Sequence, residues 1–155
     1  MNNSLSYSHL VDRIKDAGVR PSNVRVHILK YLEEHSHPTA EQIYTALRET
    51  MPTLSLASVY NTATALAEAG LIRVLGMNGA GVHYDCNTHQ HAHFQCELCG
   101  KIFDMDMPGI DCPGLEGFNV KKMDLRFWGV CPHCDALAQA ATGLYFGESE
   151  EDEKQ

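Results

Sequence analysis

Cys96-Glu97-Leu98-Cys99 and Cys131-Pro132-His133-Cys134 are two Cys-x-x-Cys pairs in a chain of 155 residues. Four thiolates around one Zn2+ form a closed tetrahedral shell, with Zn–S distances of about 2.3 Å, which stabilises a fold and leaves no coordination position for chemistry. Paired spacing in a reducing compartment favours a metal over disulfides, which are the alternative interpretation. We therefore predict a structural zinc site made of Cys96, Cys99, Cys131 and Cys134.

Other potential metal ligands cluster near the first cysteine pair. They are Asp85, His91, His93 and Asp104. A mixed set of imidazoles and carboxylates is harder than a thiolate set, and it suits Fe2+ and Mn2+ as well as Zn2+. On a strand, the His91-x-His93 spacing points both imidazoles to one face, as a shared ion requires. This second set is typical of a site that samples a metal ion reversibly.

Composition indicates a soluble chain of one or two small domains. No run of 18 apolar residues is present, and residues 1–5 lack the features of a signal peptide, so we expect a cytoplasmic protein without a membrane partner. The net charge of −8 is uneven: residues 1–75 carry seven Lys/Arg against seven Asp/Glu, and residues 76–155 carry five against thirteen. The acidic run 148–153 indicates a solvated tail, with an autoinhibitory mimic of DNA as the alternative.

The first half of the chain reads as four short helices. Apolar spacing predicts a helix over residues 4–17 that stops at Gly18. Ser22 is expected to cap a second helix and Thr39 to begin a capping box for a third, which ends by Pro52. Ser55 is expected to cap a fourth helix over residues 56–69. The expected inward-facing residues of the second and third helices are Val24, Ile28, Leu29, Leu32, Ile43 and Leu47.

Two short strands, 71–75 and 82–86, flank a glycine-rich turn and predict a β-hairpin. Helices followed by a hairpin are the order of a winged helix, in which the helix before the hairpin enters the major groove of DNA. On helix 56–69, Ser58 and Tyr60 could bond phosphate and Asn61 could address a base edge, with Thr64 also exposed. Basic residues lie elsewhere, at Arg20 and Arg25 among others, and a solvated helical face is the plain alternative for them.

A series of short motifs, in a fixed order over nearly the whole chain, is similar to the motifs of a known protein family. They are Gly18-Val19-Arg20, His37-Pro38-Thr39-Ala40-Glu41-Gln42-Ile43-Tyr44, Ser58-Val59-Tyr60-Asn61, Gly70-Leu71-Ile72, Tyr84-Asp85, His91-x-His93, Cys96-Glu97-Leu98-Cys99-Gly100-Lys101 and Gly129-Val130-Cys131-Pro132-x-Cys134. The chain resembles the ferric uptake regulator family, and within it the peroxide-sensing branch. This implies an α+β homodimer that binds an operator in double-stranded DNA: a winged-helix domain over residues 1–84, a small α/β dimerisation domain over 85–147, and an acidic tail over 148–155.

The resemblance also implies a regulatory metal site. Its ligands map onto His37, Asp85, His91, His93 and Asp104. The implied function is a repressor whose bound Fe2+ or Mn2+ fixes the angle between two domains, with Fe2+ reacting with H2O2 to oxidise His37 or His91. Asp104 favours the peroxide-sensing branch, because the iron-sensing branch commonly has Glu there. The alternative is a repressor of the same family that responds to iron or another divalent metal without sensing peroxide.

One segment departs from the pattern of the family. Cys112-Pro113-Gly114 lies where relatives carry a longer dimerisation helix, and we expect that helix to be short or absent here. Two other classes of protein are the alternatives: a zinc hydrolase would need an open coordination position and a nearby general base, and a thiol oxidoreductase would need reactive cysteines. We expect a regulator and no enzyme.

Overall fold

The computed structural model describes residues 6–77, 81–107, 109, 112–121 and 123–145. They belong to two compact units, Met1–His89 and Gln90–Gln155, here named the N-terminal and C-terminal units. The predicted acidic tail, 148–155, lies outside the described residues, and the predicted domain boundary after residue 84 stays a prediction. Within the described residues, no helix is both long and apolar enough to cross a membrane.

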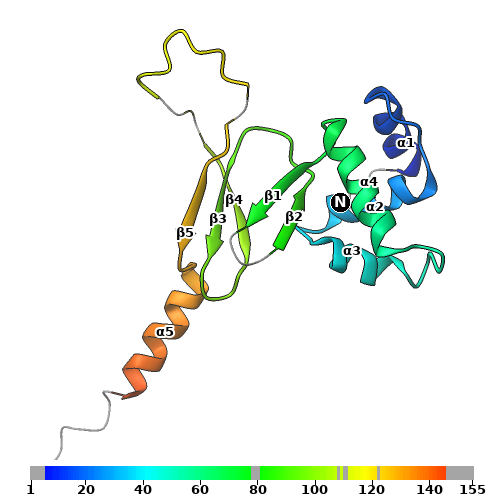
Figure 1. Ribbon diagram of the computed structural model, residues 1–155. Coiled ribbons are helices and arrows are strands. Elements are labelled where there is room, and N and C mark those ends of the chain that lie inside the picture. The colour runs from blue at the N-terminus through cyan, green and yellow to red at the C-terminus, as the bar shows by residue number, and fades with distance from the viewer. Residues whose placement is uncertain (1–5, 78–80, 108, 110–111, 122, 146–155) are drawn as a thin grey trace, which may run out of the picture. The chain divides into compact units, whose positions relative to one another are not determined.

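Four helices form the body of the N-terminal unit, as the sequence predicts (Figure 1). They are α1 (Tyr7–Asp16), α2 (Asn23–Glu34), α3 (Ala40–Leu47) and α4 (Leu56–Glu68). The three predicted N-caps are confirmed: Ser22 accepts the N–H of Arg25, Thr39 accepts that of Gln42, and Ser55 accepts that of Ser58. Local side-chain chemistry therefore sets where these helices begin.

The core of this unit lies among the helices. α2 contacts α1, α3 and α4, so it is covered on more than one side. For that reason Val26, outside the predicted stripe, is only 1% exposed, whereas the predicted Val24 is only partly buried. Leu47 is also only partly buried, because it is the last residue of α3. The remaining predicted residues, Ile28, Leu29, Leu32 and Ile43, are buried as expected.

A β-hairpin follows α4 and completes a winged helix. β1 (Arg73–Met77) and β2 (Gly81–Asp85) pair antiparallel with Leu75 opposite His83. β1 begins two residues later than predicted, because Gly70 closes α4 in the left-handed conformation (φ 73°) and Leu71 is buried against the helices. The predicted turn, 78–81, lies mostly outside the described residues.

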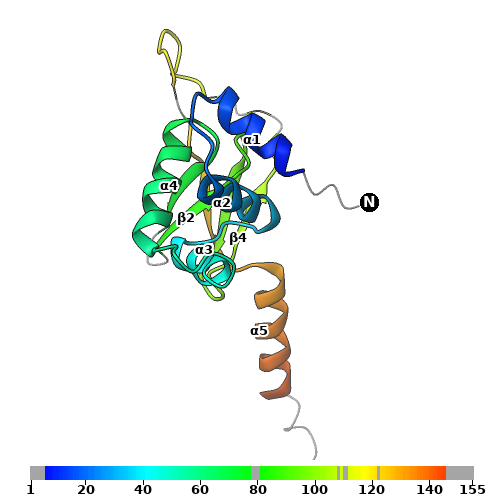
Figure 2. The same cartoon turned by 90° about the vertical axis from the view of Figure 1, so that its right-hand side faces the viewer.

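The C-terminal unit contains a three-stranded sheet in the order β4-β3-β5. β3 (Ala92–Cys96) pairs antiparallel with β4 (Ile102–Met105) and parallel with β5 (Arg126–Gly129). The last strand leads into α5 (Pro132–Tyr145), which runs as one uninterrupted helix (Figure 2). Among the described residues between 106 and 125, the chain forms turns and no helix, in agreement with the expected loss of the dimerisation helix at Cys112-Pro113-Gly114.

The capping box of α3 gives a first stability prediction. Thr39 accepts the N–H of Gln42, and the Gln42 side chain accepts the N–H of Thr39 at 2.8 Å. Thr39→Ala removes one of these two bonds and should lower the free energy of unfolding of the protein by about 1 kcal/mol. Chemical denaturation should show the loss, while Thr50→Ala, beyond the end of α3, should have a smaller effect. Equal losses in the two variants would contradict the role of the cap.

Candidate metal centres

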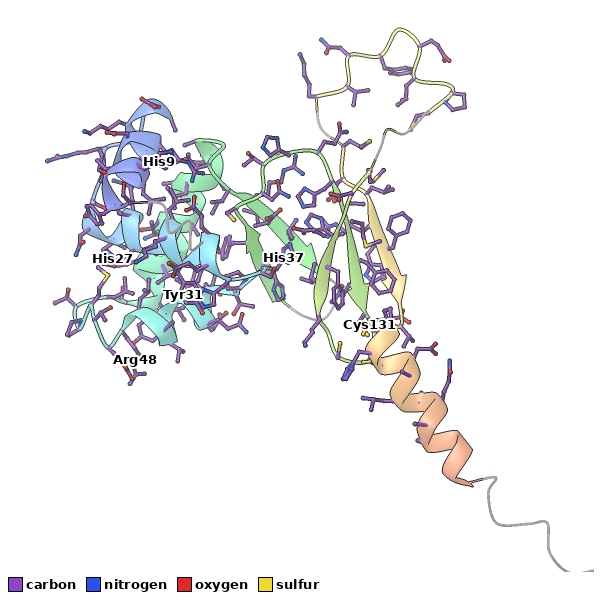
Figure 3. All side chains as sticks on the ribbon, turned by 180° about the vertical axis from the view of Figure 1, so that it is seen from behind. His9, His27, Tyr31, His37, Arg48 and Cys131 are labelled. Atoms are coloured by element: carbon purple, nitrogen blue, oxygen red, sulfur yellow. The ribbon has the colours of Figure 1, made fainter. Side chains whose placement is uncertain are left out.

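A tight turn and the start of a helix bring the four cysteines together in the C-terminal unit. The first follows β3, where Gly100 adopts φ 71° and its N–H bonds to the carbonyl of Cys96 at 2.9 Å. The second follows β5, where Cys131 precedes Pro132, the first residue of α5 (Figure 3). Because β3 and β5 are parallel, with Cys96 opposite Gly129, both cysteine pairs leave the sheet at the same end. The predicted set of four thiols is confirmed as a cluster.

The geometry of this cluster fits zinc. The four sulfur atoms all lie within 4.8 Å of one another, and the Sγ atoms of Cys99 and Cys131 are 3.9 Å apart. Two thiolates bound to one tetrahedral Zn2+ at about 2.3 Å are separated by about 3.8 Å. The Cys99 and Cys131 sulfur atoms therefore already lie at the spacing that a zinc ion requires, and the other two lie close enough to complete the set.

The electrostatics of the four thiols also favour a bound cation. The backbone N–H groups of Cys99 and then Cys131 lower the pKa of the Cys96 thiol to about 6, which prepares a thiolate. The neighbouring Cys131 sulfur, with burial and the other thiols, raises the pKa of Cys134 to about 12. Four thiolates this close repel one another strongly unless a cation lies among them. A divalent ion supplies that cation, and a set of four cysteines is typical of a structural zinc site.

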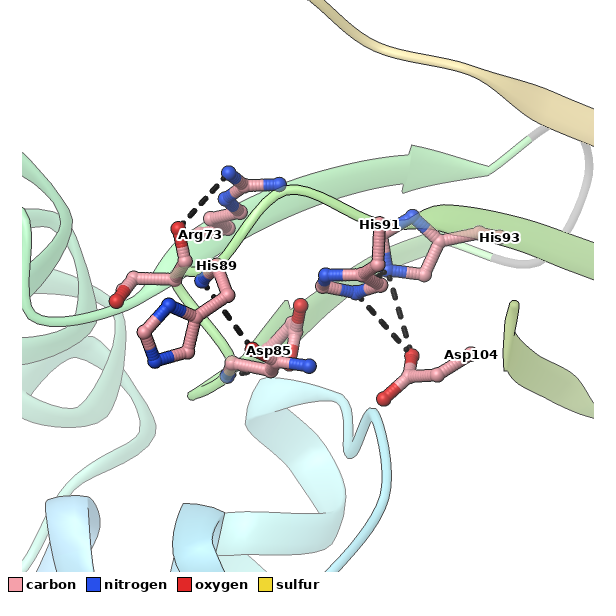
Figure 4. Close-up of polar contacts among 8 residues, drawn as sticks. Arg73, Asp85, His89, His91, His93 and Asp104 are labelled. Carbon is pink, nitrogen blue, oxygen red and sulfur yellow. Dashed lines mark hydrogen bonds and ion pairs between the residues drawn. The ribbon is translucent and has the colours of Figure 1, made fainter. Parts of the chain in front are cut away.

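The C-terminal unit also brings three harder ligands together (Figure 4). The Nε2 atoms of His91 and His93 are 2.9 Å apart, and Oδ1 of Asp104 lies 3.3 Å from the first and 3.6 Å from the second. Strand register explains this, because Asp104 on β4 is directly opposite His93 on β3. Ligands at about 2.1 Å from one ion, with angles between 90° and 110°, are roughly 3.0–3.4 Å apart. Of the three distances, 3.3 Å lies in this range, and 2.9 and 3.6 Å lie within about 0.2 Å of it, so the three donors are close enough together to bind one ion.

The N-terminal unit contributes the other two predicted ligands as a pair. Potential ligand atoms of His37 and Asp85 lie within 4.8 Å of each other, and both residues are buried, at 6% and 4% exposed. Asp85 ends β2, and its Oδ1 accepts the N–H of Asn87 at 2.7 Å. Burying a carboxylate is costly unless a cation or hydrogen bonds compensate it. An imidazole beside a buried carboxylate is the donor set of a divalent metal site.

The predicted DNA-reading residues of α4 differ in how far their side chains are exposed to solvent or engaged in local hydrogen bonds. Tyr60, Asn61 and Thr64 lie at least partly open to solvent, but the Ser58 hydroxyl is 2.9 Å from that of Ser55 within the N-cap. Of the basic candidates, Arg20 is exposed, and the guanidinium of Arg25 donates to its backbone carbonyl at 2.8 Å.

Sequence reasoning missed two polar residues that contact these predicted sites. His83 on β2 lies with its Nδ1 2.5 Å from the carbonyl oxygen of His37. Glu41, in the first turn of α3, accepts a hydrogen bond from the Tyr60 hydroxyl at 2.6 Å. Both contacts join segments far apart in the chain, so no local sequence motif predicts them.

Comparison with known proteins gives consistent matches. The model of the ferric uptake regulator family matches residues 16–127. Two relatives named peroxide-responsive repressor, from Staphylococcus epidermidis and Staphylococcus aureus, are 36% and 35% identical over 127 residues, covering 78% of this chain and 85% and 86% of theirs. The ferric uptake regulator of Helicobacter pylori has a similar fold, with a TM-score of 0.66 at 22% identity, over 87% of this chain and 97% of that one. The chain is a metal-responsive transcription regulator with a winged-helix DNA-binding domain and a dimerisation domain, and it belongs to the ferric uptake regulator family.

Proposed function

We propose that this protein is a homodimeric repressor that binds operator DNA when a divalent ion occupies His37, Asp85, His91, His93 and Asp104, and that it senses peroxide through that ion. The observation that carries the proposal is the convergence of His91, His93 and Asp104 at distances that fit a shared ion. The similarity to peroxide-responsive repressors supports the peroxide-sensing half.

Each unit has a defined part in this mechanism. His91, His93 and Asp104 hold the ion on the sheet of the C-terminal unit, and His37 and Asp85 add ligands from the winged-helix unit. A dimer has to present two recognition helices about 34–36 Å apart to two half-sites. Ligands donated by both units restrict the angle between those units, so metal binding favours one spacing of the two α4 helices.

Contacts with DNA are assigned to the exposed face of α4 and to nearby arginines. Tyr60 bonds phosphate, Asn61 and Thr64 face the base edges, and the short Ser58 hydroxyl contributes near the start of the helix. The exposed Arg20 and its neighbour Arg25 supply positive charge for the phosphate backbone. The structural Zn2+ at Cys96, Cys99, Cys131 and Cys134 keeps the dimerisation unit folded and takes no part in sensing.

Peroxide sensing depends on which ion is bound. When bound, Fe2+ would supply the redox chemistry with H2O2 in which one peroxide oxygen adds to a ligand imidazole and the other leaves as water. His37 and His91 are the two candidates, and loss of either imidazole as a ligand weakens the connection between the units. Bound Mn2+ supports DNA binding but is poor at this chemistry. An iron-responsive repressor of the same family is the second candidate function, and Asp104 at its position favours the first.

DNA binding with defined metals tests the proposal. Fluorescence anisotropy of a labelled operator should show tight binding with Fe2+ or Mn2+ under anaerobic conditions, and H2O2 should release DNA from the Fe2+ form while leaving the Mn2+ form bound. Peptide mass spectrometry of the peroxide-treated Fe2+ form should locate one added oxygen atom on a peptide that contains His37 or His91. Oxidation confined to cysteines, with histidines intact, would refute histidine-based sensing and favour the iron-responsive alternative.

A further inference from the structure

The segment that carries His37 is fixed to the wing. The N–H of Tyr84 donates to the carbonyl of Pro38 at 3.0 Å, and Thr39 pairs antiparallel with His83. Nδ1 of His83 also contacts the His37 carbonyl oxygen at 2.5 Å. Residues 37–39 are therefore joined to β2 by an isolated bridge and two flanking contacts, so a movement at His37 would be transmitted to the wing.

The backbone of His37 is itself unusual. Its φ is 49°, and among the described residues it is the one residue other than glycine with a positive φ. A side chain with a Cβ rarely adopts this region, and it persists where surrounding contacts determine it. The contacts from His83 and Tyr84 to residues 37 and 38 are such constraints. The candidate ligand is thus held in a specific conformation by β2.

A second set of contacts leads from the same segment to α4. Thr39 caps α3, whose first turn contains Glu41, and the carboxylate of Glu41 accepts the hydroxyl of Tyr60 at 2.6 Å. That hydrogen bond, followed by the Glu41 backbone, the Thr39 hydroxyl and the charge of His83, lowers the pKa of the Glu41 carboxyl. His83 contacts the His37 carbonyl and pairs with Thr39, which lies two residues before Glu41 in the chain.

We propose that His83 and Glu41 are positioning residues that couple the metal ligand His37 to Tyr60, so that metal binding changes how α4 meets DNA within one winged-helix unit. This inference rests on the proposed function, and it adds a second route to the restriction of the angle between units. When His37 is held by a metal ion, its carbonyl is fixed, and with it His83, Glu41 and the Tyr60 hydroxyl. The phenol ring is then held in one orientation on the exposed face of α4.

A simple surface effect of Glu41 has to be separated from this coupling. Glu41 is exposed and negative, so removing its charge should raise affinity for DNA whether metal is present or not. Coupling predicts something different: a change in the ratio of the DNA Kd without metal to the DNA Kd with metal. This ratio, here named the metal enhancement, does not depend on a charge effect common to both states.

A double-mutant cycle on the full-length, zinc-loaded protein measures that ratio. Operator binding is followed by anisotropy with and without Mn2+ for the wild type, Glu41→Gln, Tyr60→Phe and the double variant. We expect each single variant to lower the metal enhancement about fivefold, within the usual range of coupling between sites, and the double variant to lower it no further. Glu49→Gln removes the same charge from an exposed position after α3 and should leave the metal enhancement unchanged.

Metal affinity gives an independent readout. Without DNA, Glu41→Gln should bind Mn2+ within about twofold of the wild type by calorimetry, because Glu41 is not among the proposed ligands. With saturating DNA, reciprocity requires the Mn2+ affinity of this variant to be lower than that of the wild type. The factor should equal the factor by which the variant lowers the metal enhancement. An unchanged metal enhancement in Glu41→Gln, with DNA affinity raised equally in both states, would overturn the coupling and leave only a charge effect. Retention of the metal enhancement in His37→Ala would instead refute the proposed function.

Discussion

Replacing Cys131 with serine should release zinc and abolish cooperative folding of the C-terminal unit. Cys131 is 2% exposed, and its N–H bonds to the Cys96 sulfur at 3.4 Å, so its thiolate cannot be replaced by water without disturbing the end of β3 and the start of α5. Structural zinc contributes apparent binding free energies of about 10–16 kcal/mol, comparable with the roughly 5–15 kcal/mol that keeps a whole domain folded. The three-stranded sheet is too small to persist without that contribution.

Zinc content and oligomeric state measure the effect. Atomic absorption should give about one zinc per chain for the wild type and almost none for Cys131→Ser. Size-exclusion chromatography should show loss of the dimer. Cys112→Ser is the matched control, because Cys112 is an exposed cysteine outside the cluster and should behave as the wild type. A Cys131→Ser protein that kept its zinc and its cooperative unfolding would show that the cluster is not a structural site.

His37→Ala should remove metal-dependent DNA binding while the protein stays folded. Under the proposed function, His37 and Asp85 are the two ligands contributed by the winged-helix unit. The alanine variant therefore keeps only one ligand from that unit. A near-complete switch needs about 5.5 kcal/mol of differential affinity between two states. Removing one of the proposed ligands should lower the metal enhancement of DNA affinity by at least about 100-fold.

The histidine two residues earlier provides the comparison. His35 is exposed and stacks on Tyr31 with ring centroids 3.9 Å apart, so His35→Ala changes a histidine of the same segment outside the ligand set. It should keep the metal response. Anisotropy with Mn2+ measures both variants, and circular dichroism checks that each is folded. If His37→Ala repressed and responded to metal like the wild type, the regulatory site would have to be assigned to the C-terminal unit alone.

Features set by neighbouring residues were predictable from the sequence. The caps at Ser22, Thr39 and Ser55 lie where predicted, because a hydroxyl that accepts an N–H three residues on is a local interaction. The cysteine cluster was predictable for a related reason: two short spacings and a shared chemistry restrict the possible ligand sets.

Features set by distant parts of the chain were not predictable. The parallel pairing of β3 with β5 places Gln95 opposite Trp128, and nothing in either segment specifies that partner. The hydrogen bond from Tyr60 to Glu41 depends on how α3 packs against α4. The left-handed conformation of His37 depends on β2 in the same way. Packing also decides that Val26 is more buried than Val24, which periodicity alone assigns the other way.

The parallel arrangement of β3 and β5 has a consequence for biosynthesis. Cys96 and Cys99 are synthesised before Cys131 and Cys134, and β3 cannot pair with β5 until the residues between them have been made. During that interval the early thiols have no completed shell and are open to oxidation. Oxidation of Cys96 or Cys99 in that interval would block zinc binding, so loading of the cluster requires that both thiols stay reduced until the later pair has been made.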